Sequence, residues 1–333
     1  MFKRAHRLKI LLFILVLFLF FIFSFSRGQV YNREELSYGV TFSKKQAVSL
    51  GFDWKRIYLS IFDDLGVKRI RLLAYWNEIE SEQGKYSWQD LDWQINQASE
   101  RQAKIILAVG GRLPRWPECH FPDWTKGRLK AQVESETLSY LAQVLERYKG
   151  NRQIMAWQIE NEPFLSHFGD CPQFDKQFLD QEIALAKSLD SRPIIVTDSG
   201  ELSFWLGAAG RADIFGTTMY RDTYSGFFKS YIHYPIGPGF FRFKKNLASL
   251  FASPKDWLVI ELQAEPWGKA PYQTLPQAER DQTMNLGKFK GMIEFARQTG
   301  FKEFYLWGVE WWYWELSQGR PEVWNYARTL FAH

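Results

Sequence analysis

The 333-residue chain has few of the residues that build metal centres and disulfide scaffolds. It contains two cysteines and five histidines, and the histidines are scattered without the spacing of metal ligands. We therefore expect neither a metal nor another cofactor. The net charge of +5 is modest, and part of it lies in the first nine residues, so the composition gives no indication of nucleic-acid binding.

Repeats and low-complexity linkers are also missing after residue 30, and no Gly-rich turn follows the first expected strand. The first apolar, strand-like run is YGVTF (38–42), and it is followed by SKKQAVSL. An open, doubly wound sheet usually carries a Gly-rich turn at this point. That fold is therefore the weaker alternative here.

Aromatic residues are abundant. They make up 17% of the chain, with 15 tryptophans. Such a surplus indicates flat apolar surfaces of the kind that stack on sugar rings, although a large aromatic core would explain many of these residues as well.

The chain begins with a basic head and an uncharged run, residues 10–26, within MFKRAHRLKILLFILVLFLFFIFSFSRGQV. The run is at the lower edge of the length of a membrane span and slightly long for the core of a signal peptide. We interpret residues 1–30 as a signal anchor, with a cleaved signal peptide as the alternative. Both interpretations place residues 31–333 outside the cytoplasm, held at a membrane by the anchor or secreted after cleavage of the signal peptide.

Eight short apolar runs alternate with amphipathic stretches along the rest of the chain. This pattern predicts an α/β fold, a single (β/α)8 TIM barrel over 31–333 preceded by the N-terminal hydrophobic segment. The clearest helices are expected over 133–150 and 174–190. The expected strands are 38–42, 67–74, 104–110, 154–161, 193–199, 213–220, 257–263 and 304–310.

In such a barrel the chemistry lies at the carboxyl ends of the strands. The residues expected at that rim include two glutamates, an amide, an arginine, a tyrosine and several tryptophans. The candidates are Arg71, Trp76, Asn161, Glu162, Tyr220, Glu261 and Trp307.

Two carboxyl groups from different strands are what glycosidic bond cleavage requires. One protonates the leaving oxygen, and the other attacks the anomeric carbon or activates water. Glu162 follows the fourth expected strand and Glu261 ends the apolar run of the seventh. Glu265 is a nearby rival for the second position, but Glu261 comes directly after the apolar run.

The segment WQIENEP (157–163) resembles the strand-four signature of clan A glycoside hydrolases, the barrel enzymes that include the family 5 cellulase-like proteins. WLVIELQ (257–263) is similar to the clan's strand-seven segment. Strand three ends in GGRLPRWP, without the His that many family 5 members carry there. The sequence therefore resembles the clan more than that family, over residues 37 to about 330.

The resemblance implies a retaining β-glycosidase with a carbohydrate substrate. Glu162 would be the acid/base, Glu261 the nucleophile, and Asn161 the group that holds the sugar 2-hydroxyl. Arg71 and Tyr220 would support the nucleophile. Trp307 would form the floor of the −1 subsite and Trp76 would contribute to substrate binding, whereas Glu160 receives no role.

Two further features concern the loops. Cys119 and Cys171 follow adjacent strands, and in an exported domain they are candidates for a disulfide. The long connection 221–255 is expected to wall the cleft or to lie on a membrane surface. A transglycosylase would use the same residues, and a non-catalytic carbohydrate-binding barrel is the alternative outside enzymes.

Overall fold

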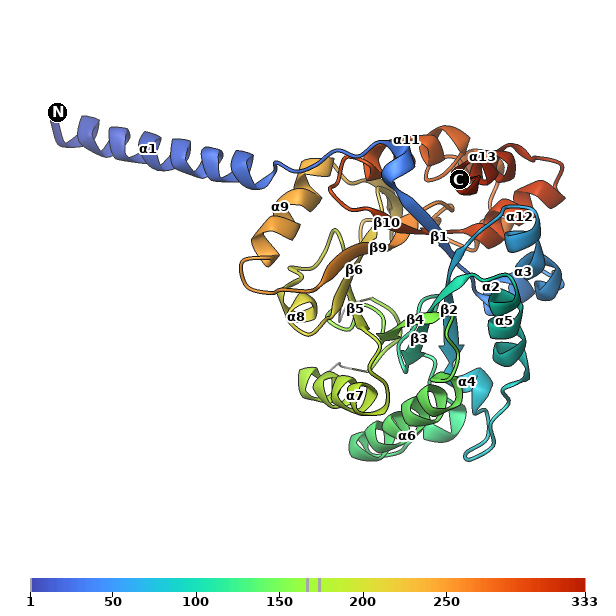
Figure 1. Ribbon diagram of the computed structural model, residues 1–333. Helices are drawn as coiled ribbons and strands as arrows, with labels where there is room; N and C mark the ends of the chain where they lie inside the picture. The colour runs from blue at the N-terminus through green and yellow to red at the C-terminus, as the bar shows by residue number, and fades with distance from the viewer. Residues whose placement is uncertain (1, 166–167, 173–174, 333) are drawn as a thin grey trace.

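The computed structural model describes residues 2–165, 168–172 and 175–332. Eight parallel strands close into a barrel in the order β1-β10-β9-β6-β5-β4-β3-β2, which confirms the predicted fold (Figure 1). Each expected strand overlaps one observed strand. The strands are β1 Ser37–Thr41, β2 Arg69–Tyr75, β3 Lys104–Gly110, β4 Ile154–Ile159, β5 Ile194–Asp198, β6 Ile214–Met219, β9 Asp256–Gln263 and β10 Glu303–Trp307.

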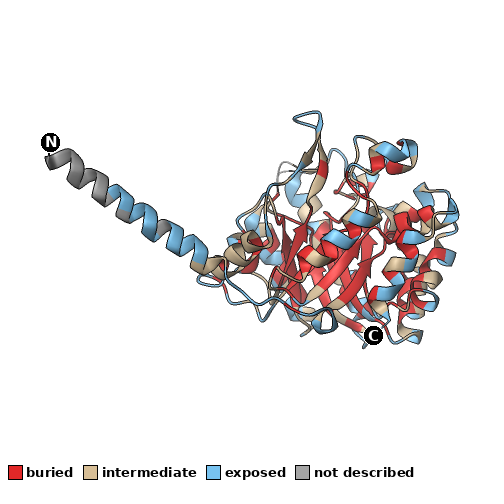
Figure 2. Ribbon diagram, turned by 90° about the horizontal axis from the view of Figure 1, so that it is seen from above, coloured by how far each residue is buried: buried red, intermediate tan, exposed pale blue. Residues whose placement is uncertain are grey.

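Helices surround the barrel, so that the buried strands lie in the middle and the exposed helix faces lie outside (Figure 2). The two clearest helices expected from the sequence are α6 and α7, although Phe174 lies outside the described residues. The helices are α1 Phe2–Phe25, α2 Lys44–Ser49, α3 Trp54–Asp63, α4 Trp76–Ile79, α5 Gln89–Glu100, α6 Lys130–Tyr148, α7 Lys176–Leu189, α8 Leu206–Ala209, α9 Pro238–Ala248, α10 Gln277–Arg280, α11 Leu286–Ala296, α12 Val309–Ser317 and α13 Glu322–Phe331.

The barrel has two apolar layers because side chains alternate between the two faces of each strand. On β2, Leu72 and Ala74 face the helices and join the large outer core. Leu73 and Tyr75 belong to a separate, smaller cluster. This alternation also decides which polar residues of a strand can reach the barrel axis.

The long connection after β6 is not a plain loop. It forms the antiparallel pair β7 Asp222–Ser225 and β8 Ser230–His233, followed by α9. Helix α9 contacts the end of α1, where Arg242 donates a hydrogen bond from Nε to the Ser26 carbonyl at 2.6 Å.

The N-terminal helix α1 extends away from the barrel (Figure 1). Apolar side chains such as Leu11, Ile14 and Phe20 are exposed along it. Within the described part of the chain, no helix has the length and apolar character that crossing a membrane requires.

Candidate active site

Most of the predicted site residues meet at the carboxyl ends of the barrel strands. Arg71 is the centre of the arrangement and is fully buried. Its guanidinium donates from Nη1 to Glu261 Oε1 at 2.7 Å, from Nη2 to Asn161 Oδ1 at 2.9 Å and from Nε to Gln158 Oε1 at 2.8 Å. Arg71 of β2 thus links Asn161, the residue before Glu162, to the expected nucleophile Glu261.

The second oxygen of Glu261 has its own donor. The Tyr220 hydroxyl donates to Glu261 Oε2 at 2.8 Å. Burial and the charge of Glu261 raise the pKa of Tyr220 well above its ordinary value, so the phenol keeps its proton and donates. Glu261 thus accepts from a cation at one oxygen and from a phenol at the other, which is the pair of supporting partners expected around a carboxylate nucleophile.

Glu162 has the opposite environment. It is buried directly after β4, and its Oε1 accepts a hydrogen bond from the Thr218 hydroxyl at 3.1 Å. Burial raises the pKa of Glu162 well above its ordinary value, and the charges of Glu261 and Glu118 raise it further. This environment favours the protonated form of Glu162, which a general acid needs.

Glu160, which had no predicted role, shapes the end of β4. Its oxygens accept hydrogen bonds from the backbone N–H groups of Gly111 at 2.7 Å and Arg112 at 2.6 Å. Its φ of 57° lies in the left-handed region. Strict strand alternation would turn Asn161 to the face opposite Gln158, and the left-handed turn instead brings it to Arg71.

A second carboxyl lies behind Glu160. Glu182 of α7 is fully buried. Burial and the charge of Glu160 raise the pKa of Glu182 well above its ordinary value. We assign the proton of this pair to Glu182, because Glu160 already accepts two N–H groups.

Residues 111–119 form a tight excursion after β3, which we call the β3 hairpin. Arg112 and Cys119 pair as antiparallel partners across it, and the Leu113 N–H donates to the Glu118 carbonyl at 2.8 Å. Cys119 and Cys171 form a disulfide, which confirms the predicted pairing. The hairpin is thereby fixed to the loop that follows β4.

Two residues of the β3 hairpin enter the site although the sequence did not single them out. Glu118 is only 7% exposed, and its burial and the charge of Glu261 raise its pKa to about 8, against the opposing effects of Arg112 and of a hydrogen bond with Asn161. Arg115 places its guanidinium carbon 4.1 Å from the centre of the Trp307 ring. Arg115 lies in the segment GGRLPRWP, but its position gave it no role in the site, since the conformation of the loop brings both residues there.

Arg115 contacts both Trp307, a predicted site residue, and Glu265, the rival candidate for the nucleophile. Trp307 ends β10 at the mouth, as predicted, but Arg115 lies over a face of its indole. Glu265 forms an ion pair with Arg115, whereas Glu261 has the partners expected of a nucleophile. The structure therefore favours Glu261 over Glu265.

Trp76 is not at the site. Its side chain is fully buried, stacks on Tyr140 of α6 with ring centres 5.3 Å apart, and donates from Nε1 to Glu80 at 2.7 Å. A residue enclosed in this way is part of the core, so the prediction that Trp76 binds substrate is wrong. Trp76 directly follows β2 as the first residue of α4, five positions after Arg71, so continuing the alternation of β2 sends the two side chains to opposite faces.

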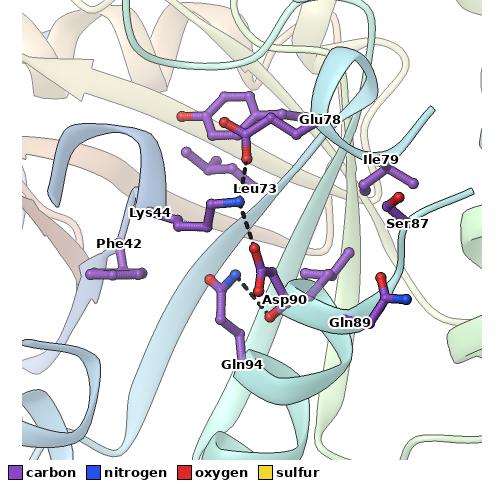
Figure 3. Close-up of a pocket in the computed structure, with 11 residues that line it drawn as sticks. Phe42, Lys44, Leu73, Glu78, Ile79, Ser87, Gln89, Asp90 and Gln94 are labelled. Carbon is purple, nitrogen blue, oxygen red and sulfur yellow. Dashed lines mark hydrogen bonds and ion pairs between the residues drawn. The ribbon is translucent and has the colours of Figure 1, made fainter. Parts of the chain in front are cut away.

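A small cavity of about 120 Å³ lies beside the mouth, between the ends of β1 and β2 (Figure 3). Three charged residues belong to its lining. Lys44 forms ion pairs there with Glu78 at 3.0 Å and with Asp90 at 2.7 Å. None of the candidate catalytic residues lines it. In the described ranges, no group of three or more His, Cys, Asp or Glu side chains is arranged to hold a metal ion.

Comparison with known proteins gives partial matches in sequence and a broad match in fold. The family model of glycoside hydrolase family 42, described as β-galactosidase, matches residues 53–191. The β-galactosidase BgaA of Clostridium cellulovorans is 24% identical over 165 residues, which cover 44% of this chain and 25% of that protein. The chain thus spans about a quarter of the length of this curated relative.

Two solved structures illustrate the match in fold. An exo-β-1,4-mannosidase from an Opitutaceae bacterium has a TM-score of 0.56 at 13% identity, covering 82% of this chain and 51% of that chain. Xylanase 10B from Thermotoga petrophila has a TM-score of 0.54 at 13% identity, covering 84% and 87%. Together with the sequence matches, they confirm the resemblance to clan A glycoside hydrolases.

Proposed function

We propose that this chain is a retaining β-glycosidase of the clan A type, with Glu261 as nucleophile and Glu162 as acid/base. The observation that carries the proposal is the difference between these two carboxyls. Glu261 accepts from a buried cation and a phenol, whereas the burial of Glu162 and the negative charges beside it raise its pKa and favour its protonated form. Pairs of carboxyls with opposed environments identify acid and base assignments.

The reaction proceeds in two displacements. Glu261 attacks the anomeric carbon while Glu162 gives its proton to the leaving glycosidic oxygen, which releases the aglycone and forms a glycosyl–enzyme ester. A water then gives a proton to Glu162 and attacks the anomeric carbon, which releases Glu261 and restores both groups. The anomeric configuration is retained because it is inverted twice.

In this proposal Asn161 holds the sugar 2-hydroxyl. Its Oδ1 accepts from Arg71 at 2.9 Å and from Gln158 at 3.2 Å, and its NH2 group also has a hydrogen bond with Glu118, which leaves one N–H of the amide to donate to a substrate. Contacts to the 2-hydroxyl strengthen as the oxocarbenium-like transition state develops. Arg71 therefore acts on both partners of the sugar, the nucleophile and the amide.

The first substrates to test are β-galactosides and β-mannosides, because the matched family, the curated relative and the mannosidase structure are described by these activities. For the cellular location, we propose an extracytoplasmic barrel held at a membrane by the N-terminal segment. The disulfide between Cys119 and Cys171 and the basic head before the apolar run support this location. Fractionation of cells with the full chain, with and without residues 1–30, tests it.

The test of function is hydrolysis of an aryl β-galactoside and an aryl β-mannoside by the full chain. We expect Glu162→Gln and Glu261→Gln each to reduce kcat by about 10² to 10⁴, whereas the exposed control Glu100→Gln keeps the wild-type rate. Azide should restore turnover by the Glu162→Ala variant. The product should be a glycosyl azide with the same anomeric configuration as the substrate. Product of inverted configuration, or glycan binding by wild type without turnover, would refute the proposal.

A further inference from the structure

We propose that the side of the barrel around α9 lies on a lipid surface, so that the barrel itself contacts the membrane in addition to the N-terminal segment. The inference rests on the membrane location proposed above, and it adds which face of the barrel meets the lipid. Of the two roles expected for the connection 221–255, it gives α9 and the turn after it the contact with a membrane surface.

The exposed apolar side chains of the barrel are concentrated in one stretch of the chain. Among the described residues after α1, eleven large apolar side chains are exposed, and seven of them fall within residues 202–251. Leu202 and Phe204 come just before α8, and Leu250 and Phe251 follow α9. Phe204 is 91% exposed and Phe251 is 72% exposed. We call these four side chains and α9 the α9 face.

A lysine of α9 brings the two parts of the α9 face together. Lys244 donates from Nζ to the carbonyl of Gly200 at 2.6 Å and to the carbonyl of Ser203 at 2.5 Å. These two bonds hold the loop that carries Leu202 and Phe204 against the helix. The turn with the other two apolar residues directly follows α9 in the chain. The exposed side chains therefore border one helix although they come from two loops.

The N-terminal helix leaves the barrel at the α9 face. Phe243 of α9 packs against Phe21 and Phe25 of α1, with ring centres 5.9 and 6.1 Å apart. Asn246 of α9 donates from Nδ2 to the Phe25 carbonyl at 2.7 Å. Figure 1 shows α1 extending away from the side of the barrel on which α8 and α9 lie. A lipid surface that α1 enters is therefore next to the α9 face as well.

The surface of α1 identifies lipid as the partner. Residues 14–17, with the sequence ILVL, are consecutive and all exposed, so apolar side chains point to every side of the helix. A helix that is apolar all round needs an apolar environment on all sides, which a bilayer supplies. Arg27, just after the helix, is exposed and has its guanidinium carbon 4.5 Å from the centre of the Phe23 ring. Basic side chains take this arrangement where lipid meets water.

The charge of this region fits a lipid surface better than a second copy of the chain. Residues 223–255 contain five Lys and Arg and no Asp or Glu. On α9, the Nζ groups of Lys244 and Lys245 donate to backbone carbonyls, and neither forms an ion pair with a carboxylate of the described residues. Anionic lipid headgroups attract such basic segments. In a symmetric pair of chains, the same cations would face each other and repel.

The proposed contact leaves the active site accessible. Helix α9 lies on the outside of the barrel, in the connection from β6 to β9, whereas the catalytic pair lies at the carboxyl ends of the strands. Contact with lipid should therefore leave the hydrolysis of a small aryl glycoside unchanged. Membrane contact and glycosidase activity are consequently measured independently.

The experiment uses the full chain, reconstituted into vesicles of phosphatidylcholine and phosphatidylglycerol. The single variants are Phe204→Cys and Phe251→Cys on the α9 face, Val48→Cys on α2 across the barrel, and Phe20→Cys on α1. Each new thiol is labelled with the fluorophore NBD while the native disulfide stays oxidised. Vesicles with and without a phospholipid that carries a nitroxide on its acyl chain are compared. We expect the nitroxide to reduce emission at positions 204 and 251 by at least about twofold and to leave position 48 unchanged.

The label on α1 separates the possible failures. If the nitroxide quenches position 20 but neither position 204 nor position 251, the membrane location stands and this inference is overturned. If position 20 also escapes quenching, the location and the inference fall together, and aryl glycoside hydrolysis by the same sample still tests the glycosidase function. Energy transfer between copies labelled at position 251, without quenching by the nitroxide, would show that a second copy covers the face and would overturn the inference too.

A double variant tests whether the α9 face contacts lipid as a unit. L250D/F251D should reduce the quenching of the label in Phe204→Cys by at least about twofold, because it brings two carboxylates to the lipid surface. The matched control is V48D, which changes an exposed apolar residue of α2 and should leave the quenching unchanged. Both should keep the wild-type kcat on the aryl glycoside. Unchanged quenching in L250D/F251D would refute the assignment of the turn after α9 to the lipid contact.

Discussion

Glu118 offers a direct test of the electrostatics of the mouth, because its substitution should change how stability depends on pH. The carboxyl lies on the β3 hairpin, is 7% exposed, and has its pKa raised from 4.5 to about 8 by burial and by the charge of Glu261. A group whose pKa is higher in the folded state stabilises that state below the unfolded pKa. This contribution is lost as pH rises through the folded value.

The size of the effect follows from these values. Between about pH 4.5 and about pH 8, each pH unit lowers the free energy of unfolding of wild type by about 1.4 kcal/mol, relative to a variant with a side chain that cannot ionise. The variant Glu118→Gln keeps the size of the side chain and cannot ionise. From pH 5 to pH 8, the free energy of unfolding of Glu118→Gln minus that of wild type should therefore rise by about 4 kcal/mol. The lost or altered hydrogen bond with Asn161 shifts all points equally and does not affect the slope.

The assay is guanidinium chloride unfolding of the oxidised protein at pH 5, 6, 7 and 8. The matched control is Glu279→Gln. Lys269 and Tyr231 lower the pKa of Glu279 by hydrogen bonding, so its titration is complete below this range and its difference curve should be flat. A flat curve for Glu118→Gln as well would refute the account of Glu118 as a buried carboxyl whose burial outweighs the opposing charge of Arg112.

Two further predictions concern stability away from the catalytic pair. Replacing Cys119 and Cys171 by Ser removes a cross-link between residues 52 positions apart. Chain entropy predicts that the free energy of unfolding, measured by chemical unfolding, falls by about 4 kcal/mol. A loss close to zero would show that the β3 hairpin is held by its other contacts. Trp76→Ala should cost about 3–5 kcal/mol because it leaves a cavity in the outer core, and KM of the folded variant should stay at the wild-type value. A large rise in KM without a loss of stability would restore Trp76 to the substrate site.

The sequence predicted the barrel and most of the catalytic centre for a physical reason. Parallel strands end at one rim, so polar residues at the ends of apolar runs must converge there whatever the helices between them look like. Arg71, Glu261 and Tyr220 were found in this way, and their mutual hydrogen bonds confirm the convergence. The position along a strand was sufficient to predict these three.

The β3 hairpin could not be predicted in the same way. Arg115 and Glu118 both have positive φ values, 86° and 72°, in a loop without glycine at those positions, and no propensity rule predicts such a conformation. The partners of Arg115 lie 150 and 195 residues away along the chain. The conformation of the β3 hairpin depends on tertiary contacts of this kind, and the periodicity of apolar residues along the sequence does not predict them.

The alternation of side chains along a strand explains two results. It accounts for the wrong prediction for Trp76 and for the role of Glu160, for which the sequence predicted none. Trp76 is an odd number of residues from Arg71, so regular alternation turns it to the helices, and attention to parity would have removed it from the site. By the same rule, Asn161 should face away from Gln158, yet both contact Arg71. The left-handed turn at Glu160 reverses the alternation at this one position, and two backbone N–H groups from the β3 hairpin hold its carboxylate. Glu160 therefore lets three consecutive polar residues follow β4 with the amide directed toward Arg71 and the acid directly after it, and it couples their placement to the β3 hairpin.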